Sequence, residues 1–270
     1  MKKIMLSNEM LYPVLGVEGV SCKEIGVYGA IRWALKLGVN RFDIGKMCGS
    51  KDEILKAFEG ARIEDDVKRE DLVLSVCCGK KDGENLREEL EQKLKDFELE
   101  NMDICFLSGK EGELKNDVML IDKWRELENM YKEGKCLAIG VENVGIIEME
   151  KLLDEVDILP MVCRIKRNPF MKNEKLADWL IKNNIAVEVL ALEKEEEEKL
   201  LNNEVLSEIA KNNDVGVKEL CLAWNLRKEM VVNSIFSDEN KFMKSLKALN
   251  LELDKNDMKR IDELEQNMTY

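Results

Sequence analysis

Short apolar runs rich in β-branched residues recur along the chain, and each has the composition of a strand buried on both faces. They lie at residues 12–17, 39–44, 71–78, 102–108, 136–141, 158–165, 185–192 and 231–236. Between them, Leu, Ile, Met and Trp recur at the spacing of one helix face. These helical segments lie at residues 23–38, 51–60, 84–100, 120–135, 145–156 and 174–184. Strand and helix are therefore predicted to alternate along the chain.

The number of predicted strands bears on the fold class. Eight of them occur in 270 residues, without a Pro/Gly/Ser-rich linker or a break in composition. The pattern favours an α/β fold of the closed (β/α)8 TIM-barrel type, with residues 1–270 as a single domain, and an open doubly wound sheet is the alternative. The opening segment, residues 2–16, predicts an N-terminal β-hairpin at the bottom of the barrel. Residues 254–266 predict a final helix capped by Asp254.

The charge balance narrows the classes of partner. The chain carries 55 acidic and 42 basic residues, which gives a formal net charge of −13. Binding to nucleic acid needs a basic surface that neutralises phosphates, so no nucleic-acid partner is predicted. The N-terminus lacks the apolar region of a signal peptide, and no apolar stretch is long enough to cross a membrane. We therefore predict a soluble cytoplasmic protein without a membrane partner.

The cysteine and histidine contents restrict the chemistry. Several of the eight cysteines lie inside apolar runs, where a thiol behaves as a small hydrophobic group, and this is typical of a reducing compartment. Histidine is absent. Its absence excludes the usual acid/base catalyst at neutral pH, the Ser-His and Cys-His nucleophile pairs, and every metal site that contains His.

Several motifs, in order along nearly the whole chain, resemble those of the aldo-keto reductase family. They are PVLG at 13–16, FDI-x-x-x-x-G at 42–49, W-x-x-x-E-x-x-Y-K-E-G-K-x-x-A-I-G-V-x-N at 124–143, NPF at 168–170 and NEVLSEIA at 203–210. The resemblance implies a (β/α)8 barrel that reduces carbonyl groups with NADPH. It also implies four catalytic groups at the carboxyl ends of strands: an Asp, a Tyr that donates a proton, a Lys that lowers the pKa of the Tyr, and a His that orients the substrate.

Carried over residue by residue, these four catalytic positions are degraded. Only the Asp is retained, as Asp43, whereas Cys48, Cys77 and Ser108 stand at the Tyr, Lys and His positions. Reduction of a carbonyl needs a donor for the developing alkoxide, and loss of such a group typically costs a factor of about 10²–10⁴ in rate. We therefore predict that hydride-transfer catalysis of the family type is absent.

The positions that bind the nicotinamide in the family have changed as well. Glu142 and Asn143 stand at the Ser-Asn pair after strand five, and Cys163 and Arg164 stand at the Asn-Gln pair of strand six. Of these four, only Asn143 matches the family. Leu190 stands at about the position where an aromatic residue stacks on the nicotinamide, and it offers no π-face.

The segments that hold the phosphates of the cofactor in the family differ too. Residues 235–240 read IFSDEN, where the family has a Lys-Ser-x-x-x-Arg pattern for the 2′-phosphate. Residues 193–199 read EKEEEEK, where the family has a loop over the pyrophosphate. An acidic segment repels phosphates, although such a run is also typical of a solvated helix start. No cofactor is therefore predicted, in contrast to the NADP of the family.

Arg164 is expected inside the barrel, because its counterpart in the family points toward the cofactor. A buried Arg is tolerated only when it is paired with carboxylates. We predict an ion pair of Arg164 with Asp43 or Glu142, which would block the position of the nicotinamide.

The leading hypothesis is a barrel of this family that has lost NADPH binding and catalysis and acts as a ligand-binding or scaffold protein. One alternative is an active, divergent NAD(P)H-dependent oxidoreductase. Another is a thiol- or metal-dependent enzyme that uses a pocket of Cys48, Cys77 and Cys163. No sequence motif marks a metal site there, and these cysteines could also simply fill space.

Basic residues follow several predicted strand ends and bear on the ligand. On an acidic protein they could attract a small molecule to the mouth at the carboxyl end of the barrel, or they could be ordinary exposed or internally paired side chains. They are Lys46, Lys80, Lys81, Lys110, Arg164, Lys166 and Arg167. A small-molecule ligand at the mouth is therefore the partner that we predict, and no oligomeric state is predicted.

Overall fold

The computed structural model describes residues 1–20, 26–47, 49–79, 85–108, 117–236 and 238–264. Eight parallel strands close into a barrel in the order β10–β3–β4–β5–β6–β7–β8–β9, which confirms the predicted fold class and rules out the open sheet. The strands are β3 (Leu15–Val20), β4 (Arg41–Asp43), β5 (Val73–Cys78), β6 (Met102–Ser108), β7 (Cys136–Glu142), β8 (Val162–Ile165), β9 (Ala186–Val189) and β10 (Val231–Phe236).

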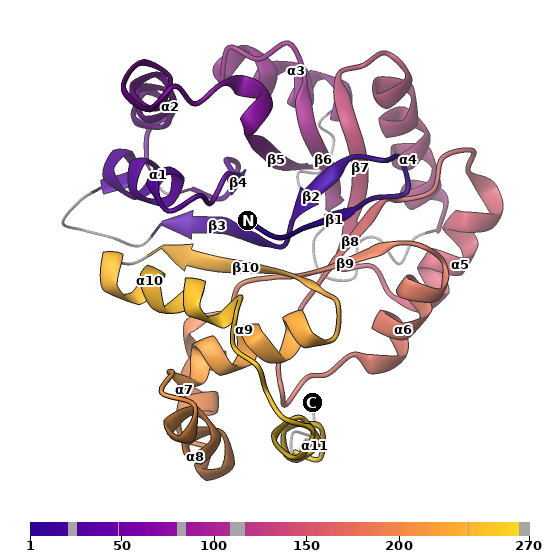
Figure 1. Ribbon diagram of the computed structural model, residues 1–270. Helices are drawn as coiled ribbons and strands as arrows, with labels where there is room; N and C mark the ends of the chain where they lie inside the picture. Colours follow the sequence, from indigo (N-terminus) through magenta and orange to yellow (C-terminus); the bar gives the residue numbers. More distant parts are fainter. Residues whose placement is uncertain (21–25, 48, 80–84, 109–116, 237, 265–270) are drawn as a thin grey trace.

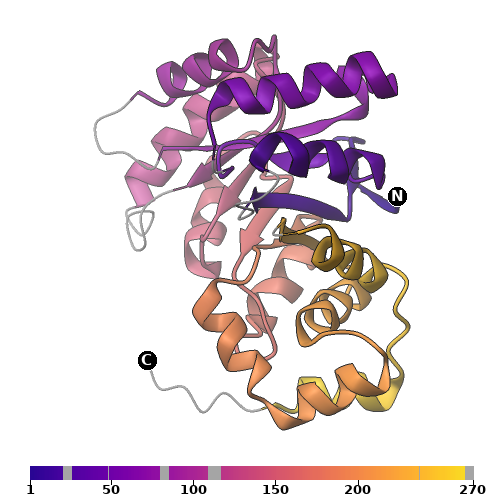
Figure 2. The ribbon, with the colours of Figure 1, turned by 90° about the vertical axis from the view of Figure 1, so that its left-hand side faces the viewer.

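Helices surround the barrel and cover its outer face (Figure 1). They are α1 (Gly26–Lys36), α2 (Lys51–Asp65), the short 3₁₀ helix η1 (Arg69–Asp71), α3 (Leu86–Asp96), α4 (Asp117–Lys132), α5 (Ile146–Glu155), α6 (Glu174–Lys182), α7 (Lys194–Leu201), α8 (Glu204–Asn212), α9 (Val217–Arg227), α10 (Glu239–Ala248) and α11 (Lys255–Asp262). Figures 1 and 2 show α7, α8 and α11 grouped on the side of the barrel opposite α2. No helix in the described ranges is long and apolar enough to span a membrane.

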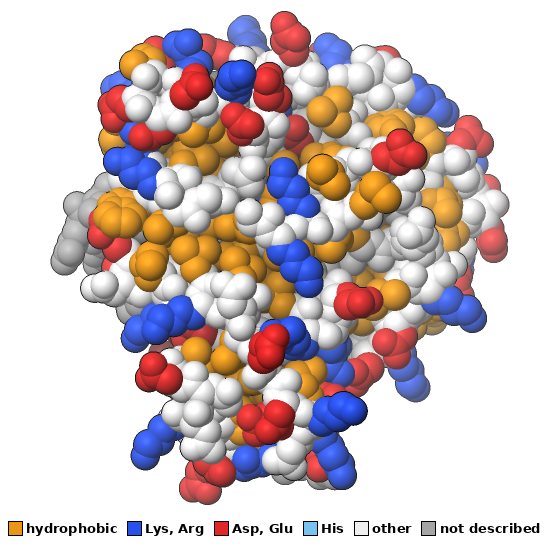
Figure 3. Space-filling view, in the orientation of Figure 1, with side chains coloured by type: hydrophobic (Ala, Val, Ile, Leu, Met, Phe, Trp, Pro, Cys, Tyr) orange, Lys and Arg blue, Asp and Glu red, His pale blue; other side chains and the backbone are white. Residues whose placement is uncertain are grey.

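A β-hairpin precedes the barrel, as the sequence predicts. Strands β1 (Lys3–Met5) and β2 (Leu11–Pro13) pair antiparallel, with Ile4 opposite Tyr12. The hairpin lies across the amino end of the barrel (Figure 1). On this face, charged side chains of both signs surround a band of hydrophobic ones (Figure 3). The buried Tyr12 hydroxyl donates a hydrogen bond to Glu188 of β9, so the hairpin closes the floor of the barrel.

Side-chain caps fix where several helices begin. Ser50 accepts a hydrogen bond from the backbone N–H of Glu53, and the carboxylate of Glu53 accepts one from the backbone N–H of Ser50. Asn85 caps α3 in the same way from its side-chain oxygen. The predicted cap of the final helix is confirmed, because Asp254 accepts from the N–H of Asp257.

The barrel wall separates two environments, because successive side chains of a strand point to opposite faces. In β4, Phe42 faces outward and packs edge-on against Phe58 of α2, with ring centroids 5.7 Å apart. Its neighbours Arg41 and Asp43 point into the barrel. Outward-facing side chains and the helices form the main hydrophobic core, and a second apolar cluster joins α7, α8, α9 and α11 around Trp224.

Candidate functional site

The barrel interior is lined with charged side chains, whereas barrels of this type are usually filled by layers of branched apolar residues. Arg41, Asp43, Glu142, Arg164 and Glu188 point into it, and each is at most 3% exposed. Charges buried this deeply are tolerated only when they are paired and hydrogen-bonded. The pairing runs continuously from the floor of the barrel to its mouth.

Glu188 is the centre of the ion pairs at the floor. Its Oε1 lies 2.9 Å from both Arg41 Nη1 and Arg164 Nε. It accepts further hydrogen bonds from Asn233 Nδ2 at 2.6 Å and from the Tyr12 hydroxyl. Burial by itself would raise the pKa of Glu188, but the two guanidinium groups outweigh it and hold this pKa at about 2. Glu188 is therefore ionised at physiological pH.

Arg164 of β8 joins the floor to the middle of the barrel. Its Nη1 forms an ion pair with Asp43 and lies 3.7 Å from Glu142 Oε2. Its Nη2 donates to Ser75 Oγ at 2.9 Å, and the guanidinium lies 3.6 Å from the centre of the Phe106 ring. Burial would lower the pKa of Arg164, but the surrounding carboxylates raise it well above its usual value. The predicted ion pair of Arg164 is confirmed, with both of the expected partners.

Lys46, in the loop after β4, bridges two carboxylates below the mouth. Its Nζ lies 2.7 Å from Glu18 Oε1 and 2.8 Å from Glu142 Oε2. Burial opposes the charge on Lys46, but these neighbours raise its pKa. The other oxygen of Glu18 accepts from the backbone N–H of Ala191 at 2.6 Å, and burial raises the pKa of the Glu18 carboxyl. Lys46 therefore stays protonated at neutral pH and holds its proton too tightly to be an effective acid.

A cavity of about 500 Å³ opens above these ion pairs, at the carboxyl ends of the strands. Glu18, Lys46 and Glu142 form its inner end, and Lys166 and Glu193, paired at 2.8 Å, lie at its rim. The wall between them is apolar and comes from the ends of β3, β9 and β10, with Val20, Leu190, Leu192 and Ile235. A cavity of this volume suits a small molecule.

The interior brings together five of the predicted site residues. Cys77 Sγ lies 3.3 Å from Glu142 Oε2 and 3.5 Å from Arg164 Nη1. Ser108 Oγ donates to the other oxygen of Glu142 at 3.1 Å. Asp43 is held by Arg164 and also accepts from two backbone N–H groups of the loop that follows it. Asp43, Cys77 and Ser108, the side chains at catalytic positions of the family that the structure describes, are thus all engaged in the charge network.

The predicted pocket of thiols is wrong for Cys163. Arg164 points into the barrel, so the preceding side chain, Cys163, faces the helices outside. Burial raises the pKa of Cys163 to about 12, and burial and the neighbouring carboxylates raise that of Cys77. Both thiols are therefore protonated and poor nucleophiles. Cys48 lies outside the described residues, and within these no group of three or more Cys, Asp or Glu side chains could hold a metal ion.

The two other residues at cofactor positions lie at the mouth. Asn143 lines the cavity with its backbone in the left-handed region, at φ 60°, and its N–H donates to the carbonyl of Arg164 at 3.0 Å. Leu190 follows β9 and supplies apolar wall. The mouth therefore offers one exposed carboxamide and aliphatic surface.

Only some of the basic residues at strand ends reach the cavity. Lys46 and Lys166 line it, as described above. Arg167 instead lies over the ring of Trp224, 4.5 Å from its centre, and its Nε donates to Asn225 at 3.0 Å. Three others lie outside the described residues, namely Lys80, Lys81 and Lys110.

Glu18 is one of the site residues that sequence reasoning missed, and Arg41 at the floor is another. Glu18 lies in the middle of β3, within the segment LGVEGV, and is 9% exposed. A single carboxylate inside an otherwise apolar strand was the available signal, because such a residue needs a cationic partner wherever the strand is buried on both faces. The sequence does not say which cation that is.

Comparisons with known proteins agree on one family. A family model described as aldo/keto reductase matches residues 23–266. The chain is 29% identical over 242 residues to the glyoxal reductase of Bacillus subtilis, which covers 87% of this chain and 82% of that protein. It is 24% identical over 263 residues to the methylglyoxal reductase DkgA of Salmonella typhimurium, with 97% and 93% covered.

Solved structures show the same fold. The chain superimposes with a TM-score of 0.85 on the crystal structure of an aldo-keto reductase enzyme from a Medee basin deep-sea metagenome library. The two are 24% identical, and the match covers 100% of this chain and 97% of the other.

Proposed function

Because this chain belongs to the aldo/keto reductase family, we propose that it is a member that binds no NADP(H), transfers no hydride, and binds a small molecule at the mouth of its barrel. The observation that carries the proposal is the position of Arg164, which is fully buried among Asp43, Glu142 and Glu188. The resemblance to the family implies that the side chain at this position points toward the cofactor. Here it belongs to the ionic interior of the barrel.

The proton donor that carbonyl reduction requires has no good substitute among the described residues. The Cys77 thiol has a raised pKa and lies against Glu142. Ser108 donates its hydroxyl proton to Glu142 as well, and a hydroxyl is a poor acid. Lys46 is held between two carboxylates that raise its pKa. Loss of such a donor typically costs a factor of about 10²–10⁴ in rate.

The amino end of α7 supports the loss of the phosphate grip. The resemblance places this segment beside the pyrophosphate of the cofactor. Here the Glu196 carboxylate accepts from the N–H of Glu193 at 3.0 Å in a capping box, and Glu195–Glu197 occupy the first turn. A helix amino end attracts phosphate through unpaired N–H groups and its dipole. In α7, the acidic side chains already interact with the N–H groups and the dipole of this helix end, and their negative charge repels a phosphate.

The remaining cavity supports a binding role. Its apolar wall and its charged inner end give a small ligand both contact area and orientation. The inner end consists of Glu18, Lys46 and Glu142, which already satisfy one another. A ligand there would meet preorganised charges rather than flexible ones.

The first test is a titration of the purified protein with NADPH, followed by fluorescence transfer and by thermal shift, with NADH and a no-cofactor sample alongside. We expect no binding up to about 1 mM, which corresponds to a binding free energy weaker than about −4 kcal/mol. Turnover of glyoxal with NADPH is measured in parallel, with the glyoxal reductase of Bacillus subtilis as the positive control. Micromolar NADPH binding or glyoxal turnover would overturn the proposed loss.

The binding role has a separate test. A fragment library is screened by thermal shift against the native chain and against Gly19→Leu, which adds a side chain at the edge of the cavity. A Cβ at Gly19 would lie 3.8 Å from the carbonyl of Lys46, an ordinary contact, and circular dichroism checks that the full leucine side chain leaves the fold native. We expect fragments that stabilise the native chain and not the variant. Equal stabilisation of both proteins would contradict binding at the mouth.

A further inference from the structure

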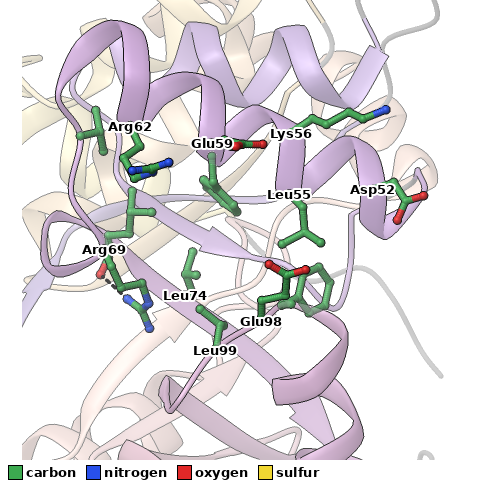
Figure 4. A pocket seen from close by; sticks show the side chains of 13 residues that line it. Asp52, Leu55, Lys56, Glu59, Arg62, Arg69, Leu74, Glu98 and Leu99 are labelled. Atoms are coloured by element: carbon green, nitrogen blue, oxygen red, sulfur yellow. Dashed lines mark hydrogen bonds between the residues drawn. The ribbon is translucent and has the colours of Figure 1, made fainter.

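A second cavity, of about 450 Å³, lies on the outer face of the barrel, between α2 and the chain that follows α3 (Figure 4). It is separate from the mouth, and none of the residues that line the mouth cavity contributes to it. A substitution in one cavity therefore leaves the lining of the other unchanged. We call this second cavity the α2 groove.

Helix α2, which lines the α2 groove, packs closely against α1. Gly60 permits the approach, since a Cβ at this position would lie 3.0 Å from both Arg32 Nη1 and the Tyr28 hydroxyl. Arg32 of α1 then pairs with Glu64 and Asp65 at the end of α2, at 2.7 and 2.6 Å. On its other side, α2 borders the cavity, whose floor includes Leu74 of β5.

Among the residues that the structure describes, one ion pair links α2 to α3 across the gap. Lys51 Nζ lies 3.1 Å from Asp96 Oδ1, and both side chains are at least one-third exposed. Such a pair contributes little stability. Beside this ion pair lies the cavity, lined by side chains of α2 and of the chain that follows α3.

The floor of the α2 groove is apolar. Leu72 and Leu74 reach it from the start and outer face of β5, Leu55 and Phe58 from α2, and Leu99 from the segment after α3. Leu55, Phe58 and Leu99 are only partly buried. Concave apolar surface with a few polar groups at its edge is the usual form of a small-molecule site, and its volume lies within the usual range of about 300–1,000 Å³.

The charges at the rim are unevenly placed. Figure 4 shows Arg62 and Arg69 at one end of the α2 groove and Asp52 toward the other, with Glu98 nearer the middle. Arg69 is held in place by Asp103 at 2.7 Å and by hydrogen bonds to the carbonyls of Leu72 and Asn101. Arg62 is exposed and makes no ion pair within the described part of the chain.

Two further charges at the rim offset each other. Lys56 and Glu59 lie three residues apart on α2, so they are neighbours of opposite sign on its surface. The Arg62 end therefore keeps a guanidinium fork that is available to an external acceptor. Such a fork matches the two oxygens of a carboxylate.

We propose that the α2 groove binds an amphipathic monocarboxylate, with its carboxylate on Arg62 and its apolar body along Phe58, Leu74 and Leu99. Arg69 lies at the same end, but its charge is balanced by Asp103. Asp52 repels the carboxylate from the opposite end and so fixes its direction. Both a fatty acid and an aromatic acid have this chemistry.

Isothermal titration calorimetry with decanoate and with 1-naphthaleneacetate tests the proposal and separates the two sources. Decanol and decylammonium serve as probes with the same chain and with no charge or the opposite charge. We expect one of the two acids to bind with one-to-one stoichiometry, and decanol and decylammonium to bind at least tenfold more weakly. No binding of either acid up to about 1 mM, or equal binding of decylammonium, would overturn the proposal.

Substitutions test whether the acid binds in the α2 groove. Arg62→Gln is expected to weaken binding of the acid about tenfold, which corresponds to about 1.4 kcal/mol. The matched control, Arg125→Gln, removes another exposed Arg on α4 and should leave binding unchanged. Leu55→Trp fills the groove and should abolish binding while circular dichroism stays native. Full binding by Arg62→Gln, or crosslinks from a diazirine-bearing decanoate that map outside residues 52–74 and 97–99, would contradict this site.

Discussion

Arg164 and Asp43 are 121 positions apart in the chain and form an ion pair inside the barrel, where their side chains are 0% and 2% exposed. Each comes from a different strand, and neither has a solvent contact that could replace the other. The pair therefore links two strands of the barrel, β4 and β8, through an interaction that requires both charges to be present.

Removal of one member of this network should be costly. Arg164→Gln leaves Asp43 and Glu188 buried without their shared cation, and breaking a buried pair in this way typically costs about 3–5 kcal/mol. The free energy of unfolding, measured in urea, should fall by that amount. The exposed Arg125→Gln should change it by less than about 1 kcal/mol. Similar losses for the two variants would mean that the interior pairs are not energetically coupled.

Acid should weaken the fold through Glu188. Its pKa falls from the usual 4.5 to about 2 on folding, so its contribution is fully present above pH 4.5 and is lost as the pH falls toward 2. The contribution is of order 3 kcal/mol. In urea titrations, Glu188→Gln should be less stable than the native chain at pH 7, and this gap should narrow between pH 4.5 and 2. A gap that is constant with pH would argue against a depressed pKa.

The thiol of Cys77, which stands at the catalytic Lys position of the family, should be unreactive in the folded protein. Cys77 is buried, and its raised pKa keeps it protonated. Treatment with iodoacetamide at pH 8, followed by peptide mapping, should label Cys77 only after urea is added. Labelling within minutes in the native state would instead favour the thiol-enzyme alternative.

Close packing of the barrel wall should make substitution of Gly140 destabilising. A Cβ at Gly140 would lie 2.6 Å from the carbonyl of Val162 and 2.7 Å from the Phe106 ring. Gly140→Ala should therefore lower the free energy of unfolding by about 1–3 kcal/mol. Gly19→Ala, where the added atom has ordinary contacts, should stay within about 0.5 kcal/mol. Thermal unfolding of the two variants compares them directly, and an unchanged Gly140→Ala would mean that β8 and the ring can move aside.

The barrel could be predicted from the sequence because strands buried on both faces leave continuous apolar runs. Element ends were harder to predict. The helix predicted at 51–60 continues to Asp65, where Asp66 ends it in the left-handed conformation. Helix α9 was not predicted, because buried residues such as Leu220, Ala223 and Trp224 surround its axis and no polar stripe marks it. A helix without an amphipathic pattern gives little periodic signal.

The ion pairs of the site were only partly predictable. Arg164 could be paired in advance because a buried guanidinium needs carboxylates and the resemblance placed two nearby. Glu18 and Lys46 meet across the mouth through the closure of the barrel, which neither local segment encodes. Cys163 was misplaced because a dipeptide on a strand presents only one of its two side chains to the interior, and Arg164 takes that place.

The charge network inside the barrel also restricts how this sequence can evolve. Arg164 and Glu142 are each held by more than one partner, so a return to the family residue at one of these positions leaves a buried charge unpaired at the other. Each such step would use much of the about 5–15 kcal/mol by which a domain is stable. Selection should therefore remove single substitutions toward the family pattern, because each one destabilises the fold before it can restore any activity. A return to the residues of the family would therefore require several substitutions in the barrel interior at the same time.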